Sequence, residues 1–299
     1  MLYYRQKILL ALIEKFGGFL NKTDLQKYLL LFAQKQTAKS FDFVPYRYGC
    51  YSFQATKDLE YLQENDYLTK SSSWTLKNNA KHYADLLNND DRKLLFDLHK
   101  NFKGLNSDNL IKYVYLNYPY YTIKSTIRER ILSKNEMATI DNIINVNFDM
   151  ENEEKTLFTI GYEGISIEEY INKLIQNNIK VLVDVRKNPL SRKYGFSKTK
   201  LESLIKNFGI EYVHIPELGI ETDKREFLKT IDDYNKLFED YENILLYKQK
   251  ELSQIEDLIK NKKRVALTCF EKDVKMCHRT RIKNRLEQLS NDAYKIMEL

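Results

Sequence analysis

The feature that most constrains the fold is a regular alternation of short apolar segments and amphipathic segments from residue 156 onward. The apolar segments have the length of strands and carry hydrophobic residues in runs, as strands buried on both faces of a sheet do. Strands that alternate with helices predict an α/β fold with a Rossmann-like parallel sheet. The predicted strands are residues 157–160, 181–183, 212–215, 264–269 and 294–297, and the predicted helices are 167–175, 200–208, 223–260 and 279–289.

Helical spacing dominates the first part of the chain instead. Apolar residues recur at this spacing in 5–16, 25–32 and 53–62, and two short strands at 65–69 and 74–77 follow. Three helices and a hairpin predict a winged-helix-like, nucleic-acid-binding module over residues 1–84, with one helix in the major groove and the wing on the backbone. A small helical module used only for protein contacts has the same pattern, and it stays open as an alternative.

The remaining residues divide into a connection and a second domain. Residues 85–150 have further helical segments interrupted at Pro119 and are predicted to form a helical bridge. Residues 147–155 are mostly polar and acidic without a core pattern, so the α/β domain with the candidate active site is placed at 151–299.

Composition excludes some classes of protein. With 299 residues the chain is long enough for two domains, and no apolar run has the length needed to cross a bilayer, so we expect a cytoplasmic protein without membrane contact. Three cysteines do not make a disulfide framework and are expected to be reduced. The net charge of +6 comes mostly from residues 1–150, which weakly favours a polyanionic partner.

Polar side chains follow the predicted strands at the points where they end. Tyr162 follows the first strand, Asp184 and Arg186 the second, His214 lies in the third, and Cys269 ends the fourth. Because the carboxyl ends of parallel strands share one edge of a sheet, ligands collect in a crevice there. The sequence therefore predicts one site shared by these strand ends.

Asp184 is the first candidate for a catalytic carboxylate. It follows three apolar strand residues, so it lies at the rim of a core where its pKa can be tuned. Arg186 could hold this carboxylate or bind a phosphate with two hydrogen bonds. A structural Asp–Arg pair that braces a loop is the alternative.

A basic loop follows this pair. Between residues 186 and 200 it has six Lys and Arg residues and no acid, which favours a phosphate-bearing substrate or a nucleic-acid backbone over a merely solvated loop. Tyr162, Tyr194 and Phe196 could stack on a base drawn into the site. The predicted substrate and phosphate contacts are Tyr162, Arg186, Arg192, Lys193, Tyr194, His278 and Arg279.

The densest group of reactive side chains lies between residues 269 and 279. Cys269 and Glu271 are further candidates for catalysis, and Cys277 lies near a helix start that could lower the pKa of a thiol. Cys269, Cys277 and His278 could also ligate zinc, with Glu271 as fourth ligand or general base. Adjacent Cys277 and His278 should point in different directions, so we expect no metal and no cofactor. The favoured interpretation is that Cys277 braces a loop and that Arg279 binds a phosphate.

Two resemblances to known families accompany these residues. Segments 25–29, 43–49 and 62–68 resemble bacterial winged-helix-like modules. Segments 159–162, 182–186 and 267–271, with Cys277-His-Arg279, resemble the uncharacterised domain-of-unknown-function family 488 over residues 156 to about 290. The second resemblance implies a compact α/β fold and brings no settled activity.

A DNA-binding module joined to a basic, carboxylate-bearing crevice predicts an enzyme that acts on nucleic acid. Removal of a base requires a flipped base, a carboxylate and phosphate contacts. We therefore expect a DNA glycosylase-type hydrolase that acts on a modified base in double-stranded DNA, with antiviral defence as a conjecture about context. The alternatives are a metal-dependent nuclease and a non-enzymatic winged-helix regulator that senses a phosphorylated small molecule.

Overall fold

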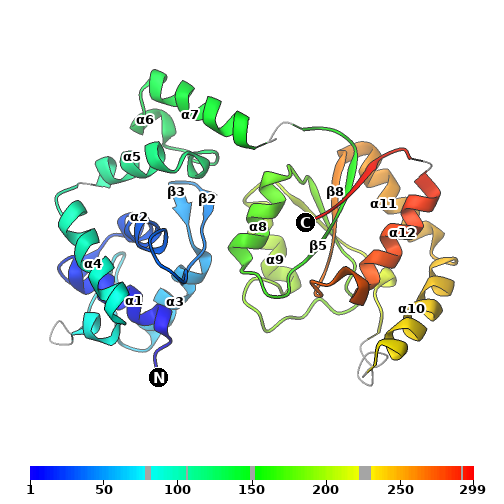
Figure 1. Ribbon diagram of the computed structural model, residues 1–299, viewed down its shortest axis with the longest axis horizontal. Helices are drawn as coiled ribbons and strands as arrows, with labels where there is room; N and C mark the ends of the chain where they lie inside the picture. Colours follow the sequence, from blue (N-terminus) through cyan, green and yellow to red (C-terminus); the bar gives the residue numbers. More distant parts are fainter. Residues whose placement is uncertain (78–81, 106, 149–151, 222–229, 291) are drawn as a thin grey trace. The chain divides into compact units, whose positions relative to one another are not determined.

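The computed structural model describes residues 1–77, 82–105, 107–148, 152–221, 230–290 and 292–299. The chain divides into two compact units, Met1–Asn147 and Phe148–Leu299 (Figure 1). Each unit is described by itself below.

The first unit is mainly helical, as predicted. Its helices are α1 (Tyr4–Lys15), α2 (Lys22–Ala33), α3 (Phe53–Glu64), α4 (Asn89–Phe102), α5 (Ser107–Asn117), α6 (Arg128–Ile131) and α7 (Lys134–Asn147). Its strands are short: β1 (Phe19–Leu20), β2 (Val44–Tyr46), β3 (Gly49–Tyr51) and β4 (Trp74–Thr75). Single turns of 3-10 helix lie at Tyr83–Leu86 and Pro119–Thr122.

Local signals in the sequence account for the starts of the main helices. The Asn21 side chain accepts the Asp24 N–H at the start of α2, and the Ser52 side chain accepts the Ala55 N–H at the start of α3. Each cap satisfies one of the N–H groups that a first helical turn leaves without a partner. Buried faces of α1 and α2 then pack together with α3 around one core.

Two small antiparallel pairs complete this unit. β1 pairs with β4, and Leu68 forms a bridge with Leu76, so residues 67–69 and 75–77 lie side by side as the predicted hairpin. β2 and β3 form a second hairpin directly before α3. No strands were predicted for residues 44–51, where this second pair lies.

Helices from the predicted bridge share the core of the first residues. Leu95 and Leu98 of α4 and Leu110 and Val114 of α5 belong to the same buried cluster as Leu9 of α1. Helices α4 and α5 both pack on α2. The division of this unit at residue 84 stays a prediction.

The second unit contains a five-stranded parallel sheet, so the predicted α/β class of this half is confirmed. Its strands are β5 (Thr156–Gly161), β6 (Val181–Asp184), β7 (Glu211–His214), β8 (Arg264–Cys269) and β9 (Lys295–Glu298), in the order β7-β6-β8-β5-β9. In the common doubly wound order the first two strands are neighbours. Here β8 lies between β5 and β6, and this arrangement brings the ends of these three strands side by side.

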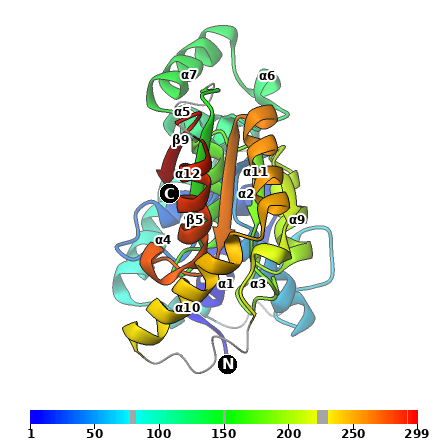
Figure 2. The ribbon, with the colours of Figure 1, turned by 90° about the vertical axis from the view of Figure 1, so that its right-hand side faces the viewer.

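Helices cover both faces of this sheet (Figures 1 and 2). α8 (Ile167–Gln176) and α9 (Lys198–Lys206) lie on one face, and α11 (Gln249–Lys262) and α12 (His278–Ser290) lie on the other. Alternate strand residues such as Val183 and Leu267 pack with Ile255 of α11 and Ile282 of α12 in one buried cluster. Burial on both faces explains why the strands read as continuous apolar runs.

One predicted helix is wrong in extent. Residues 223–260 were expected to form a single helical stretch, but α10 (Ile231–Leu245) ends before α11 begins at Gln249. No Gly or Pro lies at the break, so no local signal indicated where the helix ends. Residues 222–229 lie outside the described residues. Among the helices that are described, none combines the length and the apolar character needed to span a bilayer.

Candidate functional site

The site lies at the carboxyl edge of the parallel sheet, where four strand ends are in register. Gly161 at the end of β5 pairs with Cys269 of β8, and Asp184 at the end of β6 pairs with both Thr268 of β8 and His214 of β7. The polar residues that follow these strands therefore start from neighbouring positions on one edge.

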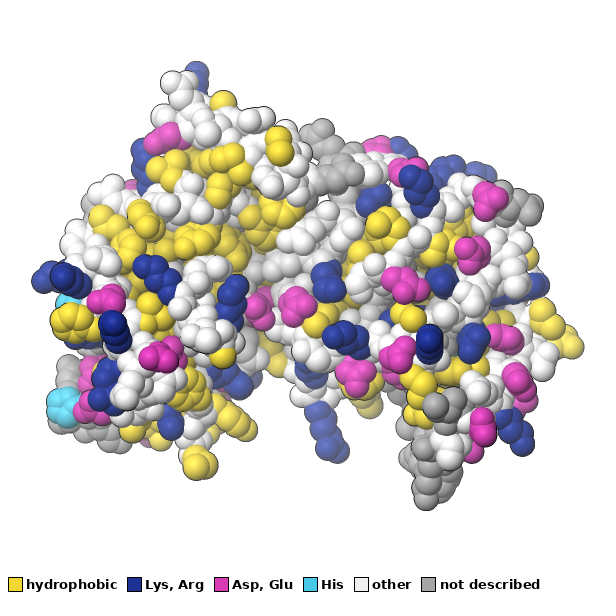
Figure 3. Space-filling view, in the orientation of Figure 1, with side chains coloured by type: hydrophobic (Ala, Val, Ile, Leu, Met, Phe, Trp, Pro, Cys, Tyr) yellow, Lys and Arg dark blue, Asp and Glu magenta, His cyan; other side chains and the backbone are white. Residues whose placement is uncertain are grey.

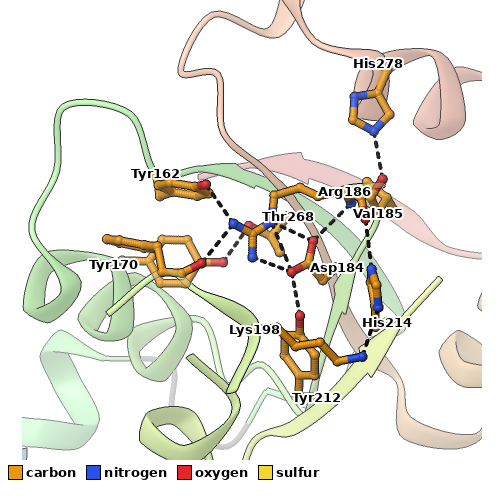
Figure 4. Close-up of polar contacts among 11 residues, drawn as sticks. Tyr162, Tyr170, Asp184, Val185, Arg186, Lys198, Tyr212, His214, Thr268 and His278 are labelled. Atoms are coloured by element: carbon orange, nitrogen blue, oxygen red, sulfur yellow. Dashed lines mark hydrogen bonds and ion pairs between the residues drawn. The ribbon is translucent and has the colours of Figure 1, made fainter. Parts of the chain in front are cut away.

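Asp184 lies at the centre of a buried hydrogen-bond network (Figure 4). Its side chain is fully buried, and its Oδ1 accepts the Arg186 backbone N–H at 3.0 Å and the Arg186 Nε–H at 2.9 Å. Its Oδ2 accepts hydrogen bonds from Arg186 Nη2 at 2.5 Å and from the Tyr212 hydroxyl at 2.6 Å. Both carboxylate oxygens are thus occupied by donors from the protein.

The same network determines what its members can do chemically. Burial disfavours the charged guanidinium, but Asp184 outweighs this effect and raises the pKa of Arg186 above its usual range. Burial and the adjacent charge of Asp184 raise the pKa of the Tyr212 hydroxyl, so it stays a donor. A carboxylate enclosed in this way cannot reach a substrate or a water molecule. The geometry favours the structural Asp–Arg pair for Asp184, in which it positions the loop that follows β6.

The donor groups of Arg186 are also occupied mainly by acceptors within the protein. Its Nη1 donates to the Tyr162 hydroxyl at 2.7 Å and to the Phe196 carbonyl at 2.9 Å, and its side chain is nearly buried. The guanidinium ties the end of β6 to the turn before α9 and to the end of β5. Few of its donors are left for a phosphate.

Two histidines hold consecutive carbonyls after β6. His214 Nε2 lies 2.9 Å from the Arg186 carbonyl, and His278 Nε2 lies 2.9 Å from the Val185 carbonyl (Figure 4). Since a carbonyl only accepts, each Nε2 carries the proton. In His278 this leaves Nδ1 as the ring nitrogen with a lone pair, and Nδ1 lies 3.5 Å from Cys269 Sγ.

Cys269, Glu271, Cys277 and His278 form a compact cluster, called the cysteine cluster below. One ligand atom from each lies within 4.8 Å of the others. Cys269 Sγ lies 3.0 Å from Glu271 Oε2, and burial together with the neighbouring Cys269 thiol raises the pKa of Cys277. The three cysteines of the chain are free thiols, as predicted.

The expectation that Cys277 and His278 diverge is wrong. Cys277 has an extended backbone, with φ −125° and ψ 132°, whereas α12 starts at His278. The chain changes direction between the two residues, so both side chains reach the same cluster. The rule that neighbours in a regular element point apart does not apply across such a junction.

Arg279 is part of the scaffold beneath this cluster. It is 2 % exposed, and its guanidinium donates to the Glu271 carbonyl and, at 3.3 Å, to the Lys272 carbonyl. A Cβ on Gly161 would lie 2.0 Å from the Glu271 carbonyl oxygen, so only glycine lets this loop approach β5. Arg279 therefore braces the loop, a role that was predicted for Cys277, and its burial leaves it no access to the phosphate that it was expected to contact.

A pocket of about 360 Å³ opens beside the cysteine cluster. It contains three basic side chains and no carboxylate, and of these Arg192 is exposed and makes no ion pair within the described part of the chain. On the face shown in Figure 3, by contrast, positive and negative side chains of the second unit are interspersed. The pocket lining is Tyr162, Arg186, Lys187, Asn188, Leu190, Ser191, Arg192, Ile220, Cys269, Phe270 and His278.

Only some of the predicted substrate and phosphate contacts lie at the pocket. Four of them, Tyr162, Arg186, Arg192 and His278, line the pocket together with the candidate Cys269. Lys193, Tyr194 and Arg279 are not part of the lining, and Lys193 Nζ donates to the Tyr162 carbonyl at 2.8 Å. Tyr162 and Phe196 are buried and stack on each other with ring centroids 4.2 Å apart, so neither ring face is open to a base.

Two exposed apolar residues of the pocket were not predicted from the sequence. Phe270 is 44 % exposed and Leu190 is 85 % exposed, although both are large and apolar. Phe270 lies between two predicted site residues and directly after a buried strand, a position that could have indicated an exposed aromatic at the strand end.

The fold and the edge site define an α/β domain with a pocket at the carboxyl ends of its strands. Residues 166–286 match the family described as Domain of unknown function DUF488, so the second unit contains a DUF488 domain and the predicted resemblance is confirmed. The matched residues include the whole cysteine cluster and Asp184, and the first unit is not assigned to a family. Comparison with curated proteins and with solved structures gave no match.

Proposed function

We propose that this protein is a DNA-binding enzyme that hydrolyses the N-glycosidic bond of a modified base. The observation that carries the proposal is the pocket at the sheet edge, which combines an exposed cation at Arg192 with an exposed ring at Phe270 and has no carboxylate in its lining. A cation suits a backbone phosphate, and an open aromatic face suits an unstacked base.

The first unit supports the nucleic-acid part of the proposal. Its order of α1, β1, α2, α3 and a terminal hairpin follows the plan of a winged helix, with β2 and β3 as an added hairpin before α3. In that plan α3 enters the major groove and residues 70–73 form the wing. Lys57 of α3 and Lys70 of the wing are exposed and are the first candidates for phosphate contacts.

The chemistry needs a group that activates water or stabilises positive charge on the sugar. Asp184 is enclosed by its donors, so this role passes to Glu271, which is only partly buried. Glu271 is not itself a lining residue, but its Oε2 lies 3.0 Å from the Sγ of Cys269, which lines the pocket. Water would add to the sugar carbon as the bond to the base breaks, and the base would leave with a proton.

The test is incubation of the full-length protein with unmodified and base-modified duplexes, including DNA from phages that modify their bases. Strand breaks that appear only after alkali are expected, because alkali cleaves at abasic sites. Glu271→Gln should lower the rate by at least about 100-fold, and Phe270→Ala should weaken substrate binding by about 1–3 kcal/mol. Arg192→Ala should weaken substrate binding, because it removes the cation assigned to a backbone phosphate. Its control is Lys206→Ala, which removes an exposed charge on α9 outside the pocket lining.

Two other functions would give different results in this test. A nuclease would produce strand breaks before alkali treatment and depend on an added metal ion. A regulator that senses a phosphorylated small molecule suits a pocket of this volume and would bind DNA without forming product. Absence of abasic sites on every duplex, with DNA binding intact, would reject the proposed hydrolysis.

A further inference from the structure

The cysteine cluster brings together donors of a kind that a soft metal ion prefers. Cys269 ends β8, Glu271 lies in the following loop, and Cys277 and His278 lie at the junction before α12. Cys269, Cys277 and His278 are each no more than 2 % exposed, while Glu271 is partly exposed. Two thiols and an imidazole are ligands typical of zinc.

The orientation of His278 is the second, independent observation. Its Nε2–H donates to the Val185 carbonyl, so the lone pair on Nδ1 points toward the thiols. Histidines that bind metal ions almost always donate their other ring N–H to a carbonyl or carboxylate in this way. The ring is therefore fixed in the tautomer and the direction that a ligand needs before any ion binds.

One pair of donors already has the spacing of a tetrahedral site, and all four donor atoms lie within 4.8 Å of one another. With Zn–S near 2.3 Å and Zn–N near 2.0 Å, the edge between a sulfur and a nitrogen ligand is about 3.5 Å, and Cys269 Sγ lies 3.5 Å from His278 Nδ1. The 3.0 Å between Cys269 Sγ and Glu271 Oε2 is shorter than such an edge. Glu271 would have to move outward by about half an ångström, which its partly exposed loop position permits.

We propose that the second unit binds one zinc ion through Cys269, Cys277 and His278, with the fourth position open to Glu271 or to a water molecule. Since Cys269 and His278 line the pocket, the ion would lie in the pocket wall, and the fourth position would be the one nearest to solvent. The three buried donors would hold the ion whichever group takes the fourth position. The inference concerns metal binding alone and stands whether or not the protein removes bases.

The first experiment measures metal in the full-length protein purified without chelators. Elemental analysis should find about one zinc ion per chain. Protein stripped with a chelator and loaded with cobalt should show the visible bands of tetrahedral cobalt and the ultraviolet band of thiolate-to-cobalt charge transfer. Zinc should protect the Cys269 and Cys277 thiols from alkylation, which mass spectrometry of the cysteine peptides would show.

The variants separate the cysteine cluster from the rest of the chain. Cys277→Ser and His278→Asn should reduce bound zinc to below about a tenth of the wild-type content, and Glu271→Gln should keep zinc, with at least about tenfold weaker affinity if Glu271 is the fourth ligand. Cys50→Ser removes the buried thiol of the first unit and should leave the zinc content unchanged. Circular dichroism identifies variants that fail to fold.

The wild-type protein alone can overturn the proposal. If it contains little zinc as purified and, after reduction, binds neither added zinc nor cobalt, the site does not bind metal. A disulfide between Cys269 and Cys277 in protein purified with a reducing agent would also contradict it. Base removal by a zinc-free protein would reject neither this inference nor the proposed function, because the readouts are separate.

Discussion

Arg186 of the second unit and Lys27 of the first are both buried cations, and their surroundings are opposite. Arg186 of the second unit is 6 % exposed and has a full carboxylate partner in Asp184, with a shortest contact of 2.5 Å. Lys27 of the first unit is 1 % exposed, and its Nζ donates to the Cys50 carbonyl at 3.2 Å. The strand end of the second unit is thus organised by an ion pair, whereas the first unit holds its lysine with a neutral acceptor.

This difference is visible in the direction of the two pKa shifts. Burial lowers the pKa of Lys27 below its ordinary value of 10.5, and the small effects of Cys50 and Asp24 do not compensate. For Arg186, Asp184 more than compensates for burial and raises the pKa. A buried charge with a partner can serve as a rigid scaffold, while one without a full counter-charge opposes folding.

The largest expected effect comes from breaking the pair in the second unit. Asp184→Asn leaves the Arg186 guanidinium buried without its counter-charge, and the free energy of unfolding should fall by about 3–5 kcal/mol. Chemical denaturation of the purified variant measures it. The double variant Asp184→Leu with Arg186→Met removes both charges and should recover much of the loss. If Asp184→Asn alone is as stable as the wild type, the carboxylate is not the structural partner that the geometry indicates.

A smaller loss is expected when one donor to Asp184 is removed. Tyr212→Phe deletes the 2.6 Å hydrogen bond to Oδ2 and keeps the ring, so about 1.5–3 kcal/mol of unfolding free energy should be lost. The change is again read from denaturation curves. Tyr234→Phe, on a partly buried tyrosine of α10, is a matched control and should have little effect.

Lys27→Met should have the opposite sign, because it removes a buried charge that has no full counter-charge. We expect a gain of about 1–3 kcal/mol near neutral pH. The folded-state pKa of Lys27 lies below the unfolded value, so the protonated lysine destabilises the fold, and wild-type stability should rise as the pH passes from the folded-state pKa toward 10.5. The gap between variant and wild type should narrow over the same window. A gap that is constant with pH would show that packing, and not charge, causes the gain.

The smallest change in stability is expected for an ion pair on the surface. It serves as a reference for the two buried cations. Lys262 Nζ lies 2.8 Å from Glu211, and both side chains are nearly half exposed. Lys262→Ala should change stability by less than about 1 kcal/mol because water solvates and screens both charges. Added salt should remove what difference there is. A loss as large as that of Asp184→Asn would mean that burial does not explain the contrast.

Much of the fold could be predicted from the sequence because it depends on local patterns. Runs such as Val181–Val183 predict buried parallel strands, and the positions of Asp184 and Cys269 directly after such runs place them at the sheet edge. The caps at Asn21 and Ser52 are local in the same sense. The roles of these residues were harder to predict, because they depend on partners that are far away in the chain.

Asp184 and the cysteine cluster illustrate this limit from two directions. Period and chain order were enough to predict that Asp184, His214 and Cys269 share one edge of an α/β domain, since they fix which strand ends carry these residues. The enclosure of Asp184 by Arg186 and Tyr212, and the turn of Cys277 and His278 toward the same point, depend on tertiary packing. The physical reason is that strand alternation is a local property of the backbone. The direction and solvation of a side chain, by contrast, depend on the packing of segments as distant as β6, β7 and the start of α12.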